Sequence, residues 1–332
     1  MILSQSEAAG DWTRIRAPAH VAQVLAALDA NVENYLDRWL AERADATAAG
    51  ALAGKFEVKM DARTLKGRTL RKLLDDALVP YDRDAKKYRD FFEEDSLDEF
   101  RDGGANAFKT ALRKEVPVIQ RTWNSPNEEL AQWKIKFQNN ASKELLATFE
   151  NLMEFASEWE RTKGAAHLDG CASAEEVGLD AINDDPTMYV IGVVGVGIKS
   201  TVLFHQWPAS FPKRDRQAMF GLFFLTGKAH FGLSTGSEFQ MIVDRDLAND
   251  GAPLLKNHRT EHNFWYPYGL FSLYAVRVWK HLKAYAARLG VPLDESHRFV
   301  WLDAFFQGIA KDLHAADIRT LLGNDERNPG WP

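Results

Sequence analysis

Residues 19–48, AHVAQVLAALDANVENYLDRWLAERADATA, decide the fold class, because their apolar side chains recur at the spacing of an α-helix. Pro18 precedes them and suits the first turn of a helix, where its missing N–H removes no helical hydrogen bond. The apolar positions are Val21, Val24, Leu25, Leu28, Val32, Tyr35, Leu36, Trp39 and Leu40. The pattern predicts one amphipathic helix of several turns.

Helical periodicity continues on the C-terminal side of this stretch. It predicts helices over 64–78, 83–92 and 105–115, the first of them ending near Pro80. A longer pattern covers 127–162 and is interrupted by the polar segment 138–140. The second half predicts helices over 267–289, 295–313 and 316–322, with Gly290 and Asp294 as stop and start signals.

Evidence for strands is confined to one β-rich run, residues 239–243. We therefore expect a mainly α protein, a multi-helix bundle with at most a small β element. Residues 163–185 are small and acidic, and the chain beyond them is richer in aromatic residues and glycine. This shift predicts two regions, an N-terminal helical region over 1–165 and a second region over 166–332.

Composition limits the classes of function. The 332 residues contain one cysteine, Cys171, which excludes a disulfide framework within the chain and four-cysteine zinc or iron–sulfur sites. We expect no cofactor and a reducing compartment, the cytoplasm. The net charge of −6 counts against non-specific coating of nucleic acid but leaves room for a locally basic groove. The longest apolar stretches, 188–196 and 219–225, are too short to cross a bilayer, so we expect no membrane partner.

The most informative segment is 185–201, DPTMYVIGVVGVGIKST, which allows two readings. As a phosphate-binding P-loop it has Gly192 and Gly197 at the required separation, but Ile198 intervenes before Lys199. In the other reading a first helix starts at Pro186 behind Asp185. A hairpin over 195–197 follows, and a second helix begins near Ile198. A glycine hairpin lets the backbone approach a DNA phosphate closely, and the second helix directs its N–H groups at it. An ordinary glycine-rich turn is the simpler alternative.

A second motif follows at residues 211–215, Phe-Pro-Lys-Arg-Asp. With residues 193–201, VVGVGIKST, it resembles the helix-hairpin-helix DNA glycosylases, whose hairpin reads LPGVG followed by x-Lys-Thr-Ala. In that family a proline-containing turn and a catalytic Asp come next, matched here by Pro212 and Asp215. The resemblance covers roughly 185–225, and Val194 stands where the family has the hairpin proline. It implies a helix-hairpin-helix element in the second region, and an enzyme that flips a base and cleaves its N-glycosidic bond.

The resemblance assigns catalysis to Asp215 and, in members that also cleave the strand, to a lysine matched by Lys199. A carboxylate at the Asp215 position stabilises the positive charge that builds on the sugar and orients the attacking water. The alternative is that Asp215 only caps a helix over 216–225. A nucleophilic lysine must lose its proton, and the alternative for Lys199 is a solvated or phosphate-facing side chain.

Two further groups of residues complete the expected site. The DNA backbone would be held by the hairpin and by nearby cations: Gly195, Val196, Gly197, Ile198, Lys213, Arg214 and Arg216. The flipped base would be stacked and hydrogen-bonded by an aromatic-polar segment: Asn263, Trp265, Tyr266 and Tyr268. Burial in the core is the alternative for these aromatic rings.

The expected function is therefore that of a DNA glycosylase-like enzyme that acts on double-stranded DNA, including DNA with modified bases. It would need no iron–sulfur cluster and no metal. Repair and defence against foreign DNA are both compatible with this chemistry. Two alternatives stay open: a non-catalytic DNA-binding protein that uses the hairpin as a backbone grip, and a P-loop-like phosphoryl-transfer enzyme.

Overall fold

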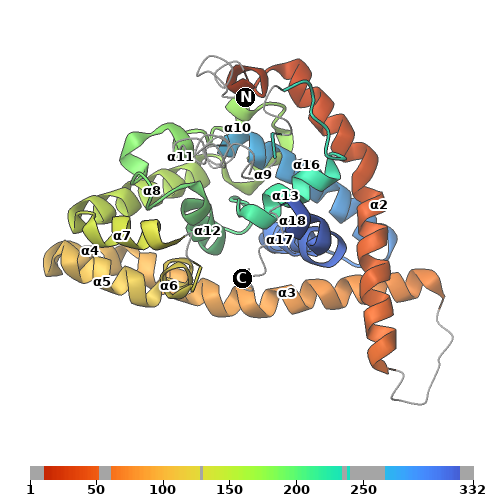
Figure 1. The fold of residues 1–332 in the computed structure, drawn as a ribbon, viewed down its shortest axis with the longest axis horizontal. Coiled ribbons are helices and arrows are strands. Elements are labelled where there is room, and N and C mark those ends of the chain that lie inside the picture. The colour runs from red at the N-terminus through yellow and green to blue at the C-terminus, as the bar shows by residue number, and fades with distance from the viewer. Residues whose placement is uncertain (1–10, 52–60, 128–129, 234–237, 240–265, 322–332) are drawn as a thin grey trace. The chain divides into compact units, whose positions relative to one another are not determined.

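The structure is a computed structural model that describes residues 11–51, 61–127, 130–233, 238–239 and 266–321 (Figure 1). Within these residues the chain is helical and contains no strand, only an isolated antiparallel bridge between Val190 and Val194. The predicted mainly α class is confirmed. Of the β-rich run over 239–243, Phe239 lies in a turn and the rest falls outside the described residues.

The chain divides into two compact units. The described part of unit 1 comprises 11–51, 61–79, 216–233, 238–239, 266 and 273–321, and that of unit 2 comprises 80–127, 130–215 and 267–272. The boundary predicted near residue 165 lies inside unit 2, so the two units do not coincide with the two regions predicted from the sequence. The hairpin segment and the 211–215 turn both belong to unit 2.

Unit 1 is built on α2 (Pro18–Ala51), which buries the predicted apolar face. The almost entirely buried α13 (Arg216–Leu225) packs against α2 and α17 (Arg298–Gln307). A π-helical turn, η4 (Gly308–Leu313), follows α17 and precedes α18 (Ala315–Leu321). Most of α16 (Tyr268–Arg288) also belongs to this unit, and a short turn, η3 (Glu295–His297), comes between α16 and α17.

Unit 2 contains the second part of α3 (Ala62–Phe92) and a series of shorter helices around an aromatic core. Phe91, Phe92, Phe108 and Phe149 meet in this core with ring centroids 4.9–6.0 Å apart. The helices are α4 (Glu94–Gly103), α5 (Ala105–Glu115), α6 (Pro117–Asn124), α7 (Ala131–Asn139), α8 (Ser142–Thr162), α9 (Gly164–Gly170), α10 (Ala174–Val177), α11 (Ala181–Asp184), η2 (Pro186–Met188) and α12 (Val196–Gln206).

Several predicted boundaries are confirmed. Helix α5 has the predicted bounds, and the pattern over 127–162 divides into α7 and α8 around Asn140. Helix α16 ends before Gly290, whose φ of +72° is a left-handed value that suits glycine. Asp294 caps the turn at 295–297, where its side chain accepts a hydrogen bond from the backbone N–H of Ser296.

The predicted helix end near Pro80 is wrong, because α3 continues through this proline. A proline inside a helix costs about 3 kcal/mol, since it removes one N–H donor and crowds the preceding turn. Beyond it, Tyr81, Ala85 and Tyr88 recur on one face and are all buried. Burial of each large side chain contributes about 1.5–3 kcal/mol, so this face offsets the defect.

Candidate nucleic-acid interface

The segment that precedes α12 forms a tight turn, but not where the sequence predicts it. The first helix expected at Pro186 is only the three-residue 3₁₀ turn η2, capped by Asp185, whose Oδ1 accepts from Thr187 N at 2.8 Å. The chain then reverses over 191–193, where Val194 N donates to Val190 O at 2.9 Å. Gly192 supplies the left-handed φ of +71° that this turn requires. The hairpin therefore lies N-terminal to the predicted position at 195–197, because Gly192 takes the left-handed conformation of the turn, whereas Gly195 is extended and Gly197 already lies in α12.

Helix α12 begins at Val196, two residues before the predicted start at Ile198. Its N-cap residue, Gly195, is extended, and no side chain caps the helix N-terminus. The N–H groups of Ile198 and Lys199 both donate to Gly195 O at 3.1 Å. These two N–H groups are already paired. The earlier donors of the first turn belong to Val196, which is buried, and to Gly197, which is partly exposed at the positive end of the helix dipole, a setting suited to an anion.

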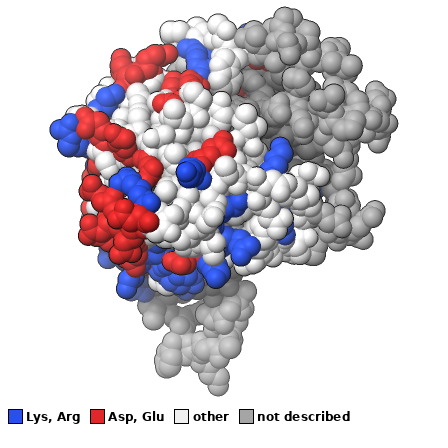
Figure 2. All heavy atoms as spheres, turned by 90° about the vertical axis from the view of Figure 1, so that its left-hand side faces the viewer, with Lys and Arg blue, Asp and Glu red and all other residues white. Residues whose placement is uncertain are grey.

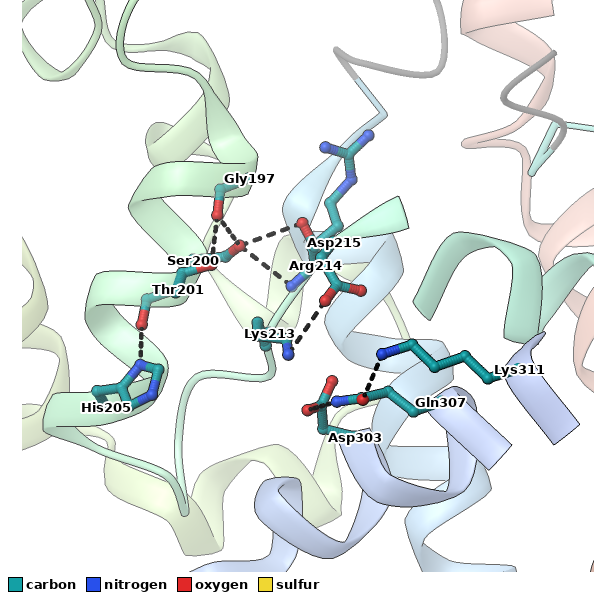
Figure 3. A network of polar contacts seen from close by, with 10 residues as sticks. All are labelled: Gly197, Ser200, Thr201, His205, Lys213, Arg214, Asp215, Asp303, Gln307 and Lys311. Atoms are coloured by element: carbon teal, nitrogen blue, oxygen red, sulfur yellow. Dashed lines mark hydrogen bonds and ion pairs between the residues drawn. The ribbon is translucent and has the colours of Figure 1, made fainter. Parts of the chain in front are cut away.

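Ser200 ties the 211–215 turn to this helix start (Figure 3). The buried Ser200 Oγ accepts a hydrogen bond from Arg214 N at 3.1 Å and lies 3.3 Å from Arg214 O. It also lies 3.3 Å from Gly197 O, one turn earlier in α12. The residue that precedes Asp215 is thus clamped beside the first turn of α12. The sequence-predicted hairpin residues and Asp215 come together in unit 2.

Buried residues hold the rest of the turn. Phe211 is fully buried between the rings of Trp159 and Trp207, at centroid distances of 5.2 and 5.8 Å. Tyr268 donates its hydroxyl proton to Pro212 O at 2.7 Å. The Phe-Pro part of the motif is therefore interior structure, and only its last residues reach the surface.

Lys213 and Asp215 form an ion pair at the exposed end of the turn. Lys213 Nζ lies 3.0 Å from Asp215 Oδ2, and the two side chains are 15% and 24% exposed. The Lys213 ammonium also lies 5.7 Å from the centre of the Phe204 ring, on α12. Asp215 directly precedes α13, so the position also suits a helix cap. The pair combines a partly accessible carboxylate with a cation at the edge of the candidate site.

Lys199 lies in the interior of unit 2. Its side chain is fully buried, and Nζ donates a hydrogen bond to Ile182 O. Burial lowers the pKa of Lys199 to about 8, while the carboxylates of Asp185 and Asp184 oppose the shift. A Schiff-base role would require this side chain to leave its buried position. The geometry is also unlike a P-loop, whose lysine must reach outward to the phosphates.

The remaining predicted residues are more scattered. Arg214 is buried, Ile198 is partly exposed, and Arg216 is the first residue of α13 in unit 1. Tyr266 and Tyr268 are both fully buried and belong to different units. Tyr266 donates to Glu238 Oε1 at 2.6 Å. Asn263 and Trp265, the other two residues of the expected base pocket, lie outside the described residues.

Sequence reasoning missed His205, which stacks on Tyr88 at a centroid distance of 4.2 Å and on Tyr81 at 5.5 Å. Its Nδ1 lies 2.7 Å from Thr201 O, so this nitrogen carries the proton of the neutral ring. Burial lowers the pKa of His205 to about 4, and the ammonium of Lys213 adds to the effect. The one sequence feature that marks His205 is its position in an apolar helical run. Nothing in the sequence links it to Tyr88.

Sequence reasoning also missed the support that α7 gives to the turn. Trp133 Nε1 donates to Val193 O at 2.8 Å, and the Trp133 ring stacks on Phe137 at 5.2 Å. The side chain of Lys136 lies against Gly192. These residues belong to the helical pattern over 127–162, and periodicity alone does not reveal which segment that helix supports.

The face of the molecule drawn in Figure 2 is not broadly basic. Figure 2 shows the side where α4, α5 and α7 lie, on which acidic and basic side chains are interspersed and several Asp and Glu gather in one area. Attraction to DNA over this face would therefore be weak.

Comparison of the chain with protein-family models, curated proteins and solved structures gave no match. In the described part of the chain, no cluster of three or more His, Cys, Asp or Glu side chains could hold a metal ion. No helix within the described ranges combines the length and apolar character that a bilayer crossing requires.

Proposed function

We propose that this chain is a DNA glycosylase-like enzyme that flips a modified or damaged base and hydrolyses its N-glycosidic bond, leaving an abasic site. One observation carries the proposal: Ser200 holds Arg214 beside the first turn of α12. Through this contact a helix start suited to phosphate and a partly exposed carboxylate lie on the same part of unit 2.

The start of α12 would hold the DNA backbone. A phosphate approaching Gly197, which is partly exposed, meets its N–H group and the positive end of the dipole, with no capping side chain in between. Such contacts position the duplex without reading its sequence. Lys213 lies close by. Its ammonium group has three N–H donors, enough to maintain the ion pair with Asp215 and bind a second phosphate at the same time.

Asp215 would act on the sugar. As the bond between C1′ and the base nitrogen breaks, positive charge builds on the sugar ring, and an anion nearby stabilises it. A water oxygen forms the new bond to C1′, and its proton goes to the carboxylate. The base leaves with the electron pair of the broken bond and takes up a proton. Because Lys199 is buried, the proposed reaction is hydrolysis without strand cleavage.

A non-catalytic DNA-binding protein is the second candidate, favoured by the uncapped start of α12, which suffices for a backbone grip. Release of a base separates the two candidates. Repair of damaged DNA and defence against DNA with modified bases would both use the proposed chemistry, in the cytoplasm that the single cysteine suggests.

The test is an abasic-site assay on duplexes that carry a panel of damaged and modified bases. We expect the wild-type protein to generate alkali-labile sites in at least one of them. Asp215→Asn should bind DNA normally and release base roughly 10²-fold more slowly or worse, the scale for loss of one preorganised electrostatic group.

Asp98→Asn is the matched control, because Asp98 is an exposed carboxylate on α4 and lies outside the candidate site. It should release base at the wild-type rate. DNA binding with no abasic sites on any duplex would leave the non-catalytic grip as the function.

A further inference from the structure

A groove of about 380 Å³ opens on unit 1, where α2, the start of α3 and the end of α16 meet. Charged side chains from all three helices line it, and apolar atoms lie beside them: Glu33, Asp37, Arg63, Lys66, Arg288 and Leu289. The lining includes three cations and two carboxylates, so the groove has a local charge of +1 in a molecule with a net charge of −6. A polar groove with this local charge favours an anionic ligand.

The walls of this groove are fixed relative to one another. Gly67 lets α3 approach the end of α16 closely, since a Cβ at this position would lie only 3.0 Å from Leu289 O. Tyr285 joins α16 to α2, because its hydroxyl group donates to Asp37 Oδ1 at 2.5 Å. The groove therefore exists before any ligand binds.

The three cations of the groove are held in place by contacts with its own walls. Lys66 Nζ lies 2.5 Å from Asp37 Oδ1, and Arg288 Nη2 lies 2.8 Å from Glu33 Oε1. Arg63 Nη2 donates to the backbone carbonyl oxygen of Arg288 at 2.5 Å. A guanidinium group has five N–H donors and an ammonium group three, so these contacts leave most of the donors for a ligand. Because the side chains are already ordered, binding would cost little conformational entropy.

This arrangement of donors suits a phosphate group. Cations from two helices can donate together to the three free oxygens of a phosphate monoester, whereas a carboxylate offers only two oxygens in one plane. The groove is also much larger than a phosphate ion, and sites for small organic molecules have volumes of about 300–1,000 Å³. Leu289 and Ala62 offer apolar contacts, and Glu33 and Asp37 can accept hydrogen bonds from hydroxyl groups.

We infer that this groove binds a phosphate monoester with a sugar or nucleoside body, and that Arg63, Lys66 and Arg288 hold its phosphate. Two of the basic side chains near the start of α3 thus face a ligand, whereas Arg68 is exposed and lies outside the groove. The groove belongs to unit 1, and Asp215 and the start of α12 belong to unit 2. The ligand would therefore bind whether or not the chain acts on DNA.

The test is calorimetric titration of the full chain in a buffer free of phosphate, with adenosine 5′-monophosphate as the probe. We expect saturable binding of this nucleotide by the wild type and no binding of adenosine, which lacks the phosphate. Inorganic phosphate should bind about tenfold more weakly or worse, because it makes no contact through an organic body. Ribose 5-phosphate should bind as tightly as the nucleotide where the sugar fills the groove, and more weakly where the base does. Either result supports a phosphate monoester.

Arg63→Gln should weaken binding of the nucleotide about tenfold or more, the value of one lost charge-assisted hydrogen bond. Arg68→Gln, at an exposed position on α3, is the matched control and should bind as the wild type does. Each variant removes one positive charge, so both have a net charge of −7, and thermal unfolding without ligand checks that both fold.

Three results would overturn the phosphate site: no saturable binding of the nucleotide at millimolar concentration, equal binding of adenosine, or equal affinities of Arg63→Gln and Arg68→Gln. Inorganic phosphate that binds as tightly as the nucleotide would overturn the organic body of the ligand. None of these results bears on base release, so the proposed function is tested separately.

Discussion

At the scale of single residues, the burial of Lys199 makes the free energy of unfolding depend on the protonation of its side chain. Its ammonium group has one described hydrogen-bond acceptor, Ile182 O, and burial lowers its pKa from 10.5 to about 8. Between these two values the unfolded chain holds the proton and the folded chain does not. Folding stability must therefore rise with pH across this window, because the unfolded state binds more protons there.

We expect the variant Lys199→Met to lack this pH dependence. Relative to the variant, the wild type should gain about 2–3 kcal/mol of unfolding free energy as pH rises from 8 to 10.5, at about 1.36 kcal/mol per pKa unit. Loss of the hydrogen bond to Ile182 O affects the variant equally at every pH. Urea unfolding of both proteins from pH 7 to 10.5 measures the effect, and a constant difference between them would place the Lys199 ammonium in contact with solvent.

Lys199 and Asp215 also show what a residue pattern reveals. Both were chosen by motif, and the structure separates them: Asp215 is partly exposed beside the start of α12, and Lys199 is fully buried. Motif spacing fixes the helical turn on which a residue lies but not the packing around it. The acceptor of Lys199, Ile182 O, belongs to α11, and no pattern within 193–201 points to it.

At the scale of elements, the proposed function assigns the contact with the DNA backbone to the start of α12, and a substitution of Gly197 tests this assignment. A Cβ at this position would meet only Arg214 O, at 3.8 Å, an ordinary van der Waals distance. Gly197→Ala should thus fold normally and be up to about 1 kcal/mol more stable, since alanine restricts the unfolded chain. Its methyl group would obstruct a phosphate, and we expect DNA affinity to fall about tenfold or more, the value of one lost charge-assisted hydrogen bond. Thermal unfolding and titration with a fluorescent duplex measure the two effects.

Gly170→Ala is the control for this variant. Gly170 ends α9 in the same unit, and a Cβ there meets nothing within 4 Å. It should gain stability to a similar extent, for the same reason, and leave DNA affinity unchanged. Equal affinities of Gly197→Ala and the wild type would mean that no phosphate approaches the first turn of α12.

The elements were predictable where the cause is local. Apolar periodicity located α2, α5, α8 and α16, and cap signals at Gly290 and Asp294 fixed two ends. Two predictions from the sequence failed because of contacts between residues that are far apart in the sequence. The buried face of Tyr81 and Tyr88 carries α3 through Pro80, and Trp133 on α7 takes up the carbonyl of Val193 in the turn before α12.

At the scale of the whole molecule, the net charge of −6 opposes association with DNA. If the proposed function holds, DNA binding comes from a few local contacts, and its salt dependence should be shallow compared with that of a broadly basic protein. Each phosphate neutralised by a lysine or arginine contributes about −0.9 to the slope of log K against log salt. The described site offers Lys213 as its partly exposed cation on the 211–215 turn, with Arg214 buried behind it.

Lys213→Gln should therefore reduce the magnitude of this slope by about 0.9, and weaken binding most at low salt. Lys87→Gln, at an exposed position on α3, is the matched control. Each variant removes one positive charge, so both have a net charge of −7 and the overall field of the protein is the same. The slopes are measured by titrating a fluorescent duplex at several salt concentrations. A difference between them can then come only from the position of the removed charge. Identical slopes would remove Lys213 from the DNA interface and leave the backbone N–H groups of α12 as the grip.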